Sequence, residues 1–379
     1  MKKTLLAGAA TSIMLLGGMA GAWAADPIVI GVQAPITGPY ANEGQGIANG
    51  VKLLADEQNA KGGLLGRMIE VKVCDDEGEA SQAAICARQL VGEKAVAVIG
   101  SYTSGAALAA QPIYARANVI QTSDGTSDEL VKKGYATWFG NAPPNSAEAD
   151  FVADYLVNVR GFKKIAVLTD HSSYATGLAN AVNSDIKRVG GNVIAFDYIN
   201  AGSQNFTPVL TKLRSMEPDV IFFSGYYSDG GLIRAQMQQL GMKAQFVGGD
   251  ANQNVAFAKI AGNAAAGSIV INVPAPQDLP YPAAKEFVQA YKAKYGAFPP
   301  SVYTLTNADG MRAVMQAITE TKSTDPKALE NYMHHLKNFQ GVTGTFSWNA
   351  EGERMGSPFV ALQVQPDGSF KVLYPAPSA

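Results

Sequence analysis

Short hydrophobic runs rich in β-branched residues alternate along the first part of the chain with longer stretches of helical periodicity. The runs occupy residues 28–32, 69–73, 96–100 and 119–122, and the helical stretches 46–58, 80–90 and 105–116. Strands that alternate with helices form mainly parallel sheets with helices on both faces. The pattern therefore predicts a first α/β unit built on four strands.

The same alternation starts again after the Pro-rich segment 141–145. Strands are predicted at 164–169, 192–197, 220–224 and 245–248, and helices at 147–159, 177–189, 208–215 and 231–239. A second Pro-rich segment, 274–282, precedes two further helical stretches, 283–295 and 308–320, which could complete the first unit. Three short strand-like runs follow, at 344–348, 359–365 and 370–374, and the pattern assigns them to neither unit. We expect two doubly wound sheets in succession.

The first 24 residues have the pattern of a signal peptide. Lys2 and Lys3 precede an apolar run over residues 4–20, and Ala22 and Ala24 are small residues at the positions that a signal peptidase reads. An uncleaved membrane anchor is the alternative, but the run is shorter than a bilayer requires and contains two consecutive glycines. We expect cleavage after Ala24 and a periplasmic mature protein.

Composition excludes some partners and indicates one crosslink. A net charge of -2 argues against nucleic acid as a partner. The chain has two cysteines, Cys74 and Cys86, and in an oxidising compartment such a pair usually forms a disulfide. A two-cysteine metal site is the alternative, but neither cysteine has a histidine nearby.

Polar residues cluster where predicted strands end and helices begin. In open α/β sheets, ligands bind beyond the carboxyl ends of the strands. Five such turns carry hydroxyl, acidic or aromatic side chains: 100–105, 122–126, 170–174, 225–227 and 248–250. By local pattern alone each is better explained as an ordinary helix cap than as a ligand site, and Thr126 with Glu129 has the spacing of a capping box. Their joint placement favours a ligand site.

The sequence supports an enzymatic function less well than a ligand-binding one. Asp170, His171 and Ser172 contain the residue types of a hydrolase triad, but three adjacent residues on one loop cannot form the relay. His334 and His335 are consecutive and so point in different directions on a helix. We therefore expect no enzymatic activity, no catalytic residue, no metal and no cofactor.

These residues carry a family resemblance. The chain resembles the leucine/isoleucine/valine-binding family of periplasmic solute-binding proteins, the receptors of branched-chain-type amino-acid ABC transporters. The resemblance runs from Ile28 to about Phe370 and rests on the segments 31–39 (GVQAPITGP), 59–63, 74–76, 98–100, 128–130, 174–178, 224–226 and 260–262.

The resemblance implies a type I periplasmic binding protein fold, in which two α/β lobes are joined by three crossovers and close on a ligand. Lobe 1 would comprise residues 25–144 and 275–357, and lobe 2 residues 145–274 and 358–379.

The resemblance also implies a set of ligand contacts. A ligand α-carboxylate would be held by Ser104 and Thr126, and an α-ammonium by Thr126, a carbonyl near Asp124 and the side chain of Asp250. The aromatic contacts would be Tyr174 and Tyr226 as walls and Tyr102 beside the ligand side chain.

Two acidic residues depart from the family pattern. Asp124 stands where leucine-type receptors have a small apolar residue, and Glu43 stands near a family tyrosine. If both face the ligand, the surplus carboxylates require a cation or a donor-rich group, which favours a basic or amide-bearing ligand over leucine. In the alternative, Glu43 points to solvent and Asp124 caps its own turn.

The expected role is capture of an amino acid or related amide and its delivery to the membrane permease and ATPase subunits of an ABC transporter. The alternative is a ligand sensor of the amide-sensing or chemoreceptor type. In either role we expect a monomer.

Overall fold

The computed structural model of the protein describes residues 26–356 and 359–375. The expected signal peptide, residues 1–24, lies outside the described residues. None of the described helices is long and apolar enough to cross a membrane.

The first sheet is entirely parallel and has the strand order β2-β1-β3-β4-β5. Its strands are β1 (Ile28–Ala34), β2 (Ile69–Asp75), β3 (Ala97–Gly100), β4 (Ile120–Ser123) and β5 (Trp138–Gly140). The four predicted strands are present. The edge strand β5 was not predicted, because three residues between turns show no periodicity.

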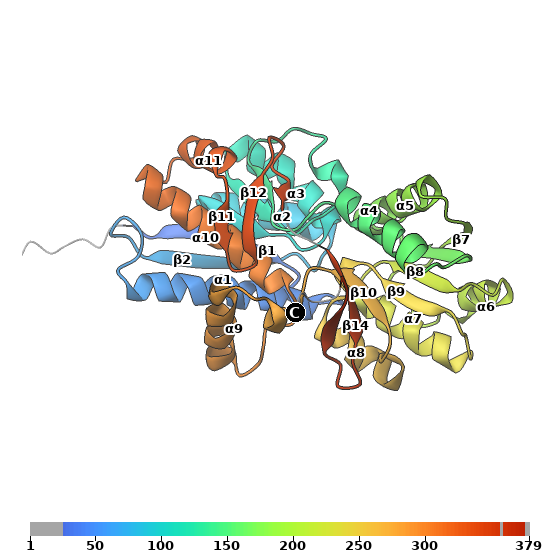
Figure 1. Ribbon diagram of the computed structural model, residues 1–379. Helices are drawn as coiled ribbons and strands as arrows, with labels where there is room; N and C mark the ends of the chain where they lie inside the picture. The colour runs from blue at the N-terminus through green and yellow to red at the C-terminus, as the bar shows by residue number, and fades with distance from the viewer. Residues whose placement is uncertain (1–25, 357–358, 376–379) are drawn as a thin grey trace, which may run out of the picture.

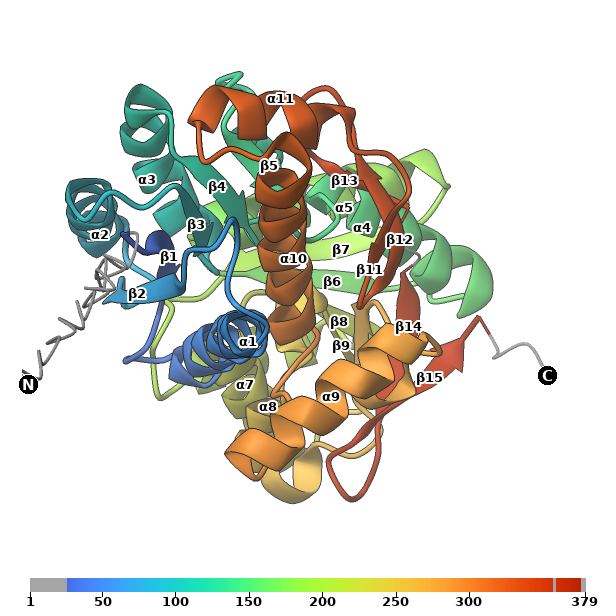
Figure 2. The same ribbon diagram turned by 90° about the vertical axis from the view of Figure 1, so that its left-hand side faces the viewer.

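Helices cover both faces of this sheet because its strands alternate their side chains. In β3, Ala97 and Ile99 join the core beneath one set of helices, whereas Val98 joins a separate core beneath the other. The first set contains α1 (Ala41–Ala60), α9 (Pro282–Tyr295), α10 (Tyr303–Thr321) and α11 (Pro326–His335), and the second contains α2 (Ala80–Gly92) and α3 (Ser104–Ala117). Segments 282–335 thus complete the first unit, as the pattern allowed, and Figure 2 shows α10 with α1 and α9 on one side of it and α11 on the other.

The second sheet has the order β15-β14-β10-β9-β8-β6-β7. Its strands are β6 (Ile165–Thr169), β7 (Val193–Tyr198), β8 (Val220–Ser224), β9 (Gln245–Gly248), β10 (Ile269–Asn272), β14 (Val360–Val364) and β15 (Phe370–Tyr374). The strands from β7 to β10 are parallel, whereas β14 and β15 are antiparallel. The expectation of mainly parallel sheets is confirmed, and the antiparallel pairing is confined to this edge, where a tight turn joins β14 and β15 as a hairpin.

Helices again cover both faces. In β8, Val220 and Phe222 pack towards α4 (Asn145–Asp154) and α5 (Ser173–Arg188), and Ile221 and Phe223 pack towards the opposite helices. These are α6 (Thr207–Ser215), α7 (Tyr227–Gln239) and α8 (Val255–Ala261). The predicted helix 147–159 begins two residues earlier and ends in a wider turn over Tyr155–Val159, and α8 was not predicted. Short 3₁₀ turns occupy Asp128–Leu130, Asp250–Asn252, Gly262–Ala264 and Pro276–Asp278.

The chain passes three times between the two units: after β5, after β10 and after a small third sheet. This antiparallel sheet contains β11 (Phe339–Gly341), β12 (Gly344–Trp348) and β13 (Arg354–Met355). It is tied to the first unit by Trp348, whose indole nitrogen donates to the carbonyl oxygen of Gly140 at 2.6 Å. Figure 1 shows the two units side by side, with β14 returning to the second unit.

The expected disulfide joins Cys74 of β2 to Cys86 of α2, with the two Cα atoms 5.5 Å apart. It closes a short loop at the edge of the first sheet. The bond therefore fixes α2 against the strand from which it emerges.

Candidate functional site

Side chains from the carboxyl ends of strands in both sheets enclose one small cavity. Its lining consists of Tyr102, Ser104, Asp124, Thr126, Tyr174, Tyr226, Asp250, Ala251 and Tyr303. Seven of the eight residues that the sequence singled out for the ligand are brought together here, and Glu43 is not. The cavity volume is about 10 Å³, which is room for roughly one water molecule. The two units are therefore closed on each other in this structure.

One end of the cavity presents hydroxyl groups at the start of α3. The Ser104 Oγ accepts hydrogen bonds from the backbone N–H groups of Thr126, at 3.1 Å, and Ser127, at 3.2 Å. With its lone pairs engaged, this hydroxyl retains its own hydrogen as a donor. Together with the positive end of α3, the Ser104 hydroxyl favours an anionic group such as a carboxylate.

The turn after β4 differs in detail from the expected capping box. Ser127, and not Thr126, precedes the 3₁₀ turn as its cap, and its Oγ accepts from the N–H of Glu129 at 3.4 Å. The Thr126 side chain instead lines the cavity. The sequence pattern thus placed the cap one residue too early.

Asp250, which follows β9 and is buried, supplies carboxyl oxygens as hydrogen-bond acceptors. Its Oδ1 accepts from the Tyr174 hydroxyl at 2.6 Å and from the N–H of Ala251 at 2.7 Å, and the Tyr303 hydroxyl also hydrogen-bonds to Asp250. Burial raises the pKa of this carboxyl, although these hydrogen bonds act in the opposite direction.

Glu148, which sequence reasoning missed, lies behind Asp250. Its Oε1 accepts from the backbone N–H of Asp250 at 2.9 Å, and burial together with the charge of Asp250 raises the pKa of Glu148 well above its usual range. Sequence gave no signal for it, because an acidic residue in the first turn of a helix is ordinary. The two carboxyl groups repel each other when both are charged, which favours the protonated form of Glu148.

Five tyrosine rings form a continuous cluster around the cavity. Tyr226 is central, with ring centroids 4.5 Å from Tyr40, 5.2 Å from Tyr174 and 5.7 Å from Tyr102. Tyr303 lies edge-on to Tyr102 at 5.4 Å. Tyr40 and Tyr303 were not predicted, although both begin helices directly after turns. Among the described residues, nothing accepts from or donates to the buried Tyr102 hydroxyl.

Asp124 lines the cavity beside α10, the helix that begins at Tyr303. Its Oδ1 accepts from the Thr306 hydroxyl at 2.7 Å, and its Oδ2 accepts from the side-chain amide of Asn307. Burial raises the pKa of Asp124 well above its usual range. The alternative in which Asp124 caps its own turn is therefore wrong, since its carboxylate faces α10.

Glu43 is buried in the junction between the units. Its Oε1 accepts from the Asn254 side-chain amide at 2.6 Å, and its Oε2 accepts from the Ser301 hydroxyl at 2.7 Å. Asn254 caps α8 of the second unit, so this bond joins the units directly. Burial raises the pKa of Glu43 to about 7. The alternative in which Glu43 points to solvent is wrong.

The residues of the apparent triad serve structural purposes. The Ser172 Oγ caps α5 by accepting from the N–H of Ala175 at 3.1 Å, and Asp170 accepts from the N–H of Ser172 at 2.7 Å. The His171 ring stacks on Tyr198 with centroids 4.8 Å apart. Within the described ranges, no group of three His, Cys, Asp or Glu residues could hold a metal ion.

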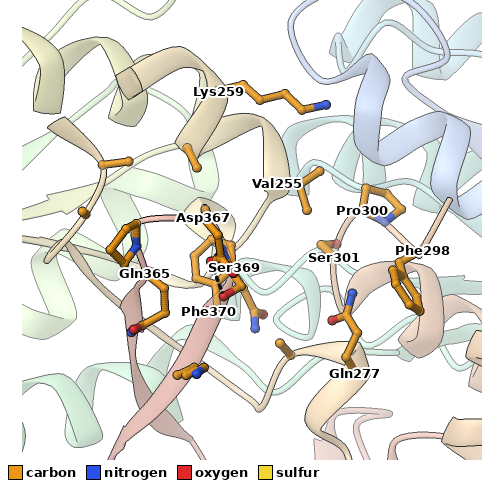
Figure 3. Close-up of a pocket in the computed structure, with 18 of the residues that line it drawn as sticks. Val255, Lys259, Gln277, Phe298, Pro300, Ser301, Gln365, Asp367, Ser369 and Phe370 are labelled. Atoms are coloured by element: carbon orange, nitrogen blue, oxygen red, sulfur yellow. Dashed lines mark hydrogen bonds between the residues drawn. The ribbon is translucent and has the colours of Figure 1, made fainter. Parts of the chain in front are cut away.

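A much larger groove, of about 740 Å³, lies elsewhere along the junction. Figure 3 shows it between Val255 and Lys259 on one side, Phe298 to Ser301 on another, and the β14–β15 turn. None of the predicted ligand residues lines this groove. Size alone therefore does not mark the site, and the convergent chemistry lies in the small cavity.

Two doubly wound units, three connections and a cavity between the strand ends define a two-lobed binding protein. The family model described as "Periplasmic binding protein" matches residues 27–369. The chain belongs to this family, and the resemblance to its leucine/isoleucine/valine-binding members is confirmed.

Similar proteins agree over nearly the whole length. The chain is 31% identical over 353 residues to Leu/Ile/Val-binding protein homolog 3 of Brucella melitensis, covering 93% of this chain and 94% of the relative. It is similar to the structure of the leucine binding protein LivK of Thermotoga maritima, with a TM-score of 0.85, 27% identity and coverage of 91% and 97%. The branched-chain amino acid transporter substrate binding protein LivJ of Streptococcus pneumoniae, in complex with isoleucine, gives a TM-score of 0.84, 28% identity and coverage of 91% and 98%.

Proposed function

We propose that the protein is the periplasmic solute-binding component of an amino-acid ABC transporter. It captures an amino acid or a related amide between its two units and delivers it to a membrane permease driven by ATPase subunits. The observation that carries this proposal is the cavity itself, where hydroxyl donors at the start of α3 face a carboxylate after β9.

The donors and the acceptor that line the cavity match the two charges of an amino acid, and the units must part to admit it, because the closed cavity has room for about one water molecule. A carboxylate removed from water needs donors, which Ser104, Thr126 and the start of α3 supply. An ammonium needs acceptors, and Asp250 supplies a charged one. A ligand that contacts both units stabilises their closed arrangement by its differential contacts with that form.

The lobe boundaries belong to the same proposal. We assign residues 25–144 and 275–357 to lobe 1 and residues 145–274 and 358–379 to lobe 2, as supported by the membership of the two main sheets. Closure then turns on the three connections between them. Residues 1–24 act as a cleaved export signal, and mass spectrometry of the periplasmic fraction should find a mature chain that begins at Ala25.

Asp250→Ala tests the proposed site. Isothermal titration calorimetry with a panel of amino acids, on protein freed of co-purified ligand, should show an affinity loss between about tenfold and a few hundredfold, because a charge-assisted hydrogen bond is removed. The matched control is Asp56→Ala, since Asp56 lies on the exposed face of α1 and pairs with Lys294. Unchanged affinity in Asp250→Ala would place the ammonium elsewhere and refute this site.

A further inference from the structure

The lining of the ligand cavity contains more acidic side chains than one α-ammonium requires. Asp250 and Asp124 both line it, and they come from different units. Among the described residues that line it, none is a lysine, arginine or histidine. One carboxylate suffices for one ammonium, so the second is in surplus.

The hydrogen bonds of Asp124 do not remove this surplus. Thr306 and Asn307 satisfy its oxygens with neutral donors, which stabilise the carboxylate without cancelling its charge. The cation that acts on Asp124 at longer range is Arg354, whose guanidinium donates to Asp309 and to the carbonyl oxygen of Asn141. A further positive charge near Asp124 would therefore be favourable.

Aromatic rings rather than aliphatic groups make up most of the remaining lining of the cavity. Ala251 is the single aliphatic residue of the lining, whereas Tyr102, Tyr174, Tyr226 and Tyr303 contribute four rings. Tyrosine faces attract cations, most strongly where water is excluded. The unpartnered Tyr102 hydroxyl offers an additional oxygen acceptor for an N–H group.

We propose that the ligand is an amino acid with a cationic side chain, whose distal charge is held by Asp124 and by the faces of Tyr102 and Tyr303. This inference rests on the proposed amino-acid function and names its ligand class. The α-carboxylate lies at Ser104 and the α-ammonium at Asp250, so the side chain extends towards α10. A branched aliphatic side chain would leave Asp124 buried without a countercharge.

Calorimetry with arginine, lysine, leucine, glutamine and glutamate tests the assignment on the mature protein. Arginine or lysine should bind at least about tenfold more tightly than leucine, since a charge-assisted contact to Asp124 is gained. Asp124→Asn should weaken binding of the cationic ligand by about tenfold to a hundredfold and change binding of neutral amino acids by less than about threefold. Asp56→Asn is the matched control on the exposed face of α1.

A pair of substitutions separates the ring from its hydroxyl. Tyr102→Phe keeps the aromatic face and removes only the hydroxyl acceptor, so affinity for the cationic ligand should fall by a few-fold at most, about threefold. Tyr102→Leu removes the face and should weaken it by about tenfold. Urea unfolding midpoints of all variants establish that each is folded.

The outcomes distinguish the two proposals. Leucine bound as tightly as arginine, tighter binding of glutamate, or equal losses for cationic and neutral ligands in Asp124→Asn would overturn the cationic assignment and leave amino-acid capture intact. Absence of binding to every amino acid tested would overturn both.

Discussion

Glu43→Gln tests whether the closed junction between the units persists without ligand. Glutamine keeps the length of the side chain and can accept from Asn254, so the substitution mainly removes the ionisable group. In the closed structure the carboxyl is fully buried, and it would be hydrated if the empty protein opened. The two conformations therefore differ in the proton affinity of Glu43, and the substitution isolates this group from the other buried acids.

The magnitude follows from the shifted pKa. Burial raises the pKa of Glu43 from its ordinary 4.5 to about 7, so the native state holds its proton over a pH range where the unfolded state releases it. Native protein then binds more protons than unfolded protein, and stability falls as pH rises through that window. Between about pH 5 and about pH 8 the contribution of Glu43 should decline by about 2–3 kcal/mol.

Urea unfolding of ligand-free protein at both pH values measures this contribution. The buried Trp138 and Trp348 report unfolding of the first unit by their fluorescence. The free energy of unfolding of wild type should fall by about 2–3 kcal/mol more than that of Glu43→Gln, and the variant should be the more stable protein at about pH 8. Other buried acidic groups titrate in both wild type and Glu43→Gln, so their contributions to the free energy of unfolding cancel in the difference between the two. Parallel pH profiles would show that Glu43 stays hydrated and that the junction opens without ligand.

Three further substitutions follow from local geometry. Replacing Cys74 and Cys86 by serine should lower the free energy of unfolding by about 3 kcal/mol, as urea titration measures. Without the crosslink the unfolded chain has more conformational entropy, which stabilises the unfolded state. Gly44→Ala should lower the thermal unfolding temperature, since a Cβ would stand 2.0 Å from the carbonyl oxygen of Pro35. Tyr174→Phe removes a hydroxyl donated to the ammonium-facing carboxylate and should weaken amino-acid binding in calorimetry by about tenfold, with little change in unfolding midpoint.

Periodicity predicted the elements whose burial repeats along the chain and missed those that are short. β5 has three buried residues, too few to show a period, whereas β10 has four, as many as the predicted strand β9, and was missed nonetheless. The hairpin of β14 and β15 could not be assigned to a unit because its partner β10 lies far away in sequence. The sequence nevertheless placed the ends of β3 and β6 correctly, since each is followed by a helix with a side-chain cap, Thr103 for α3 and Ser172 for α5.

Some residues of the candidate site could likewise be predicted from the sequence, whereas others could not. Ser104, Asp124, Tyr174 and Asp250 follow strands directly, so their convergence could be predicted from the topology of parallel sheets. Tyr303 reaches the cavity from α10, which enters the first unit only after the chain has passed through most of the second. Such a contact depends on the path of the chain through both units and leaves no local signal.

The hydrogen bond between Glu43 and Asn254 joins the units, but neither residue lines the ligand cavity. The bond therefore affects the affinity for all ligands without affecting the selectivity among them. A contact of this kind adds the same free energy to closure whatever the cavity holds. Strengthening it would tighten binding of every ligand equally, but it would also close the empty protein, and an empty closed receptor would compete with loaded ones for the permease. The free-energy cost of burying the Glu43 carboxylate opposes closure, so the junction determines how readily the ligand-free receptor closes.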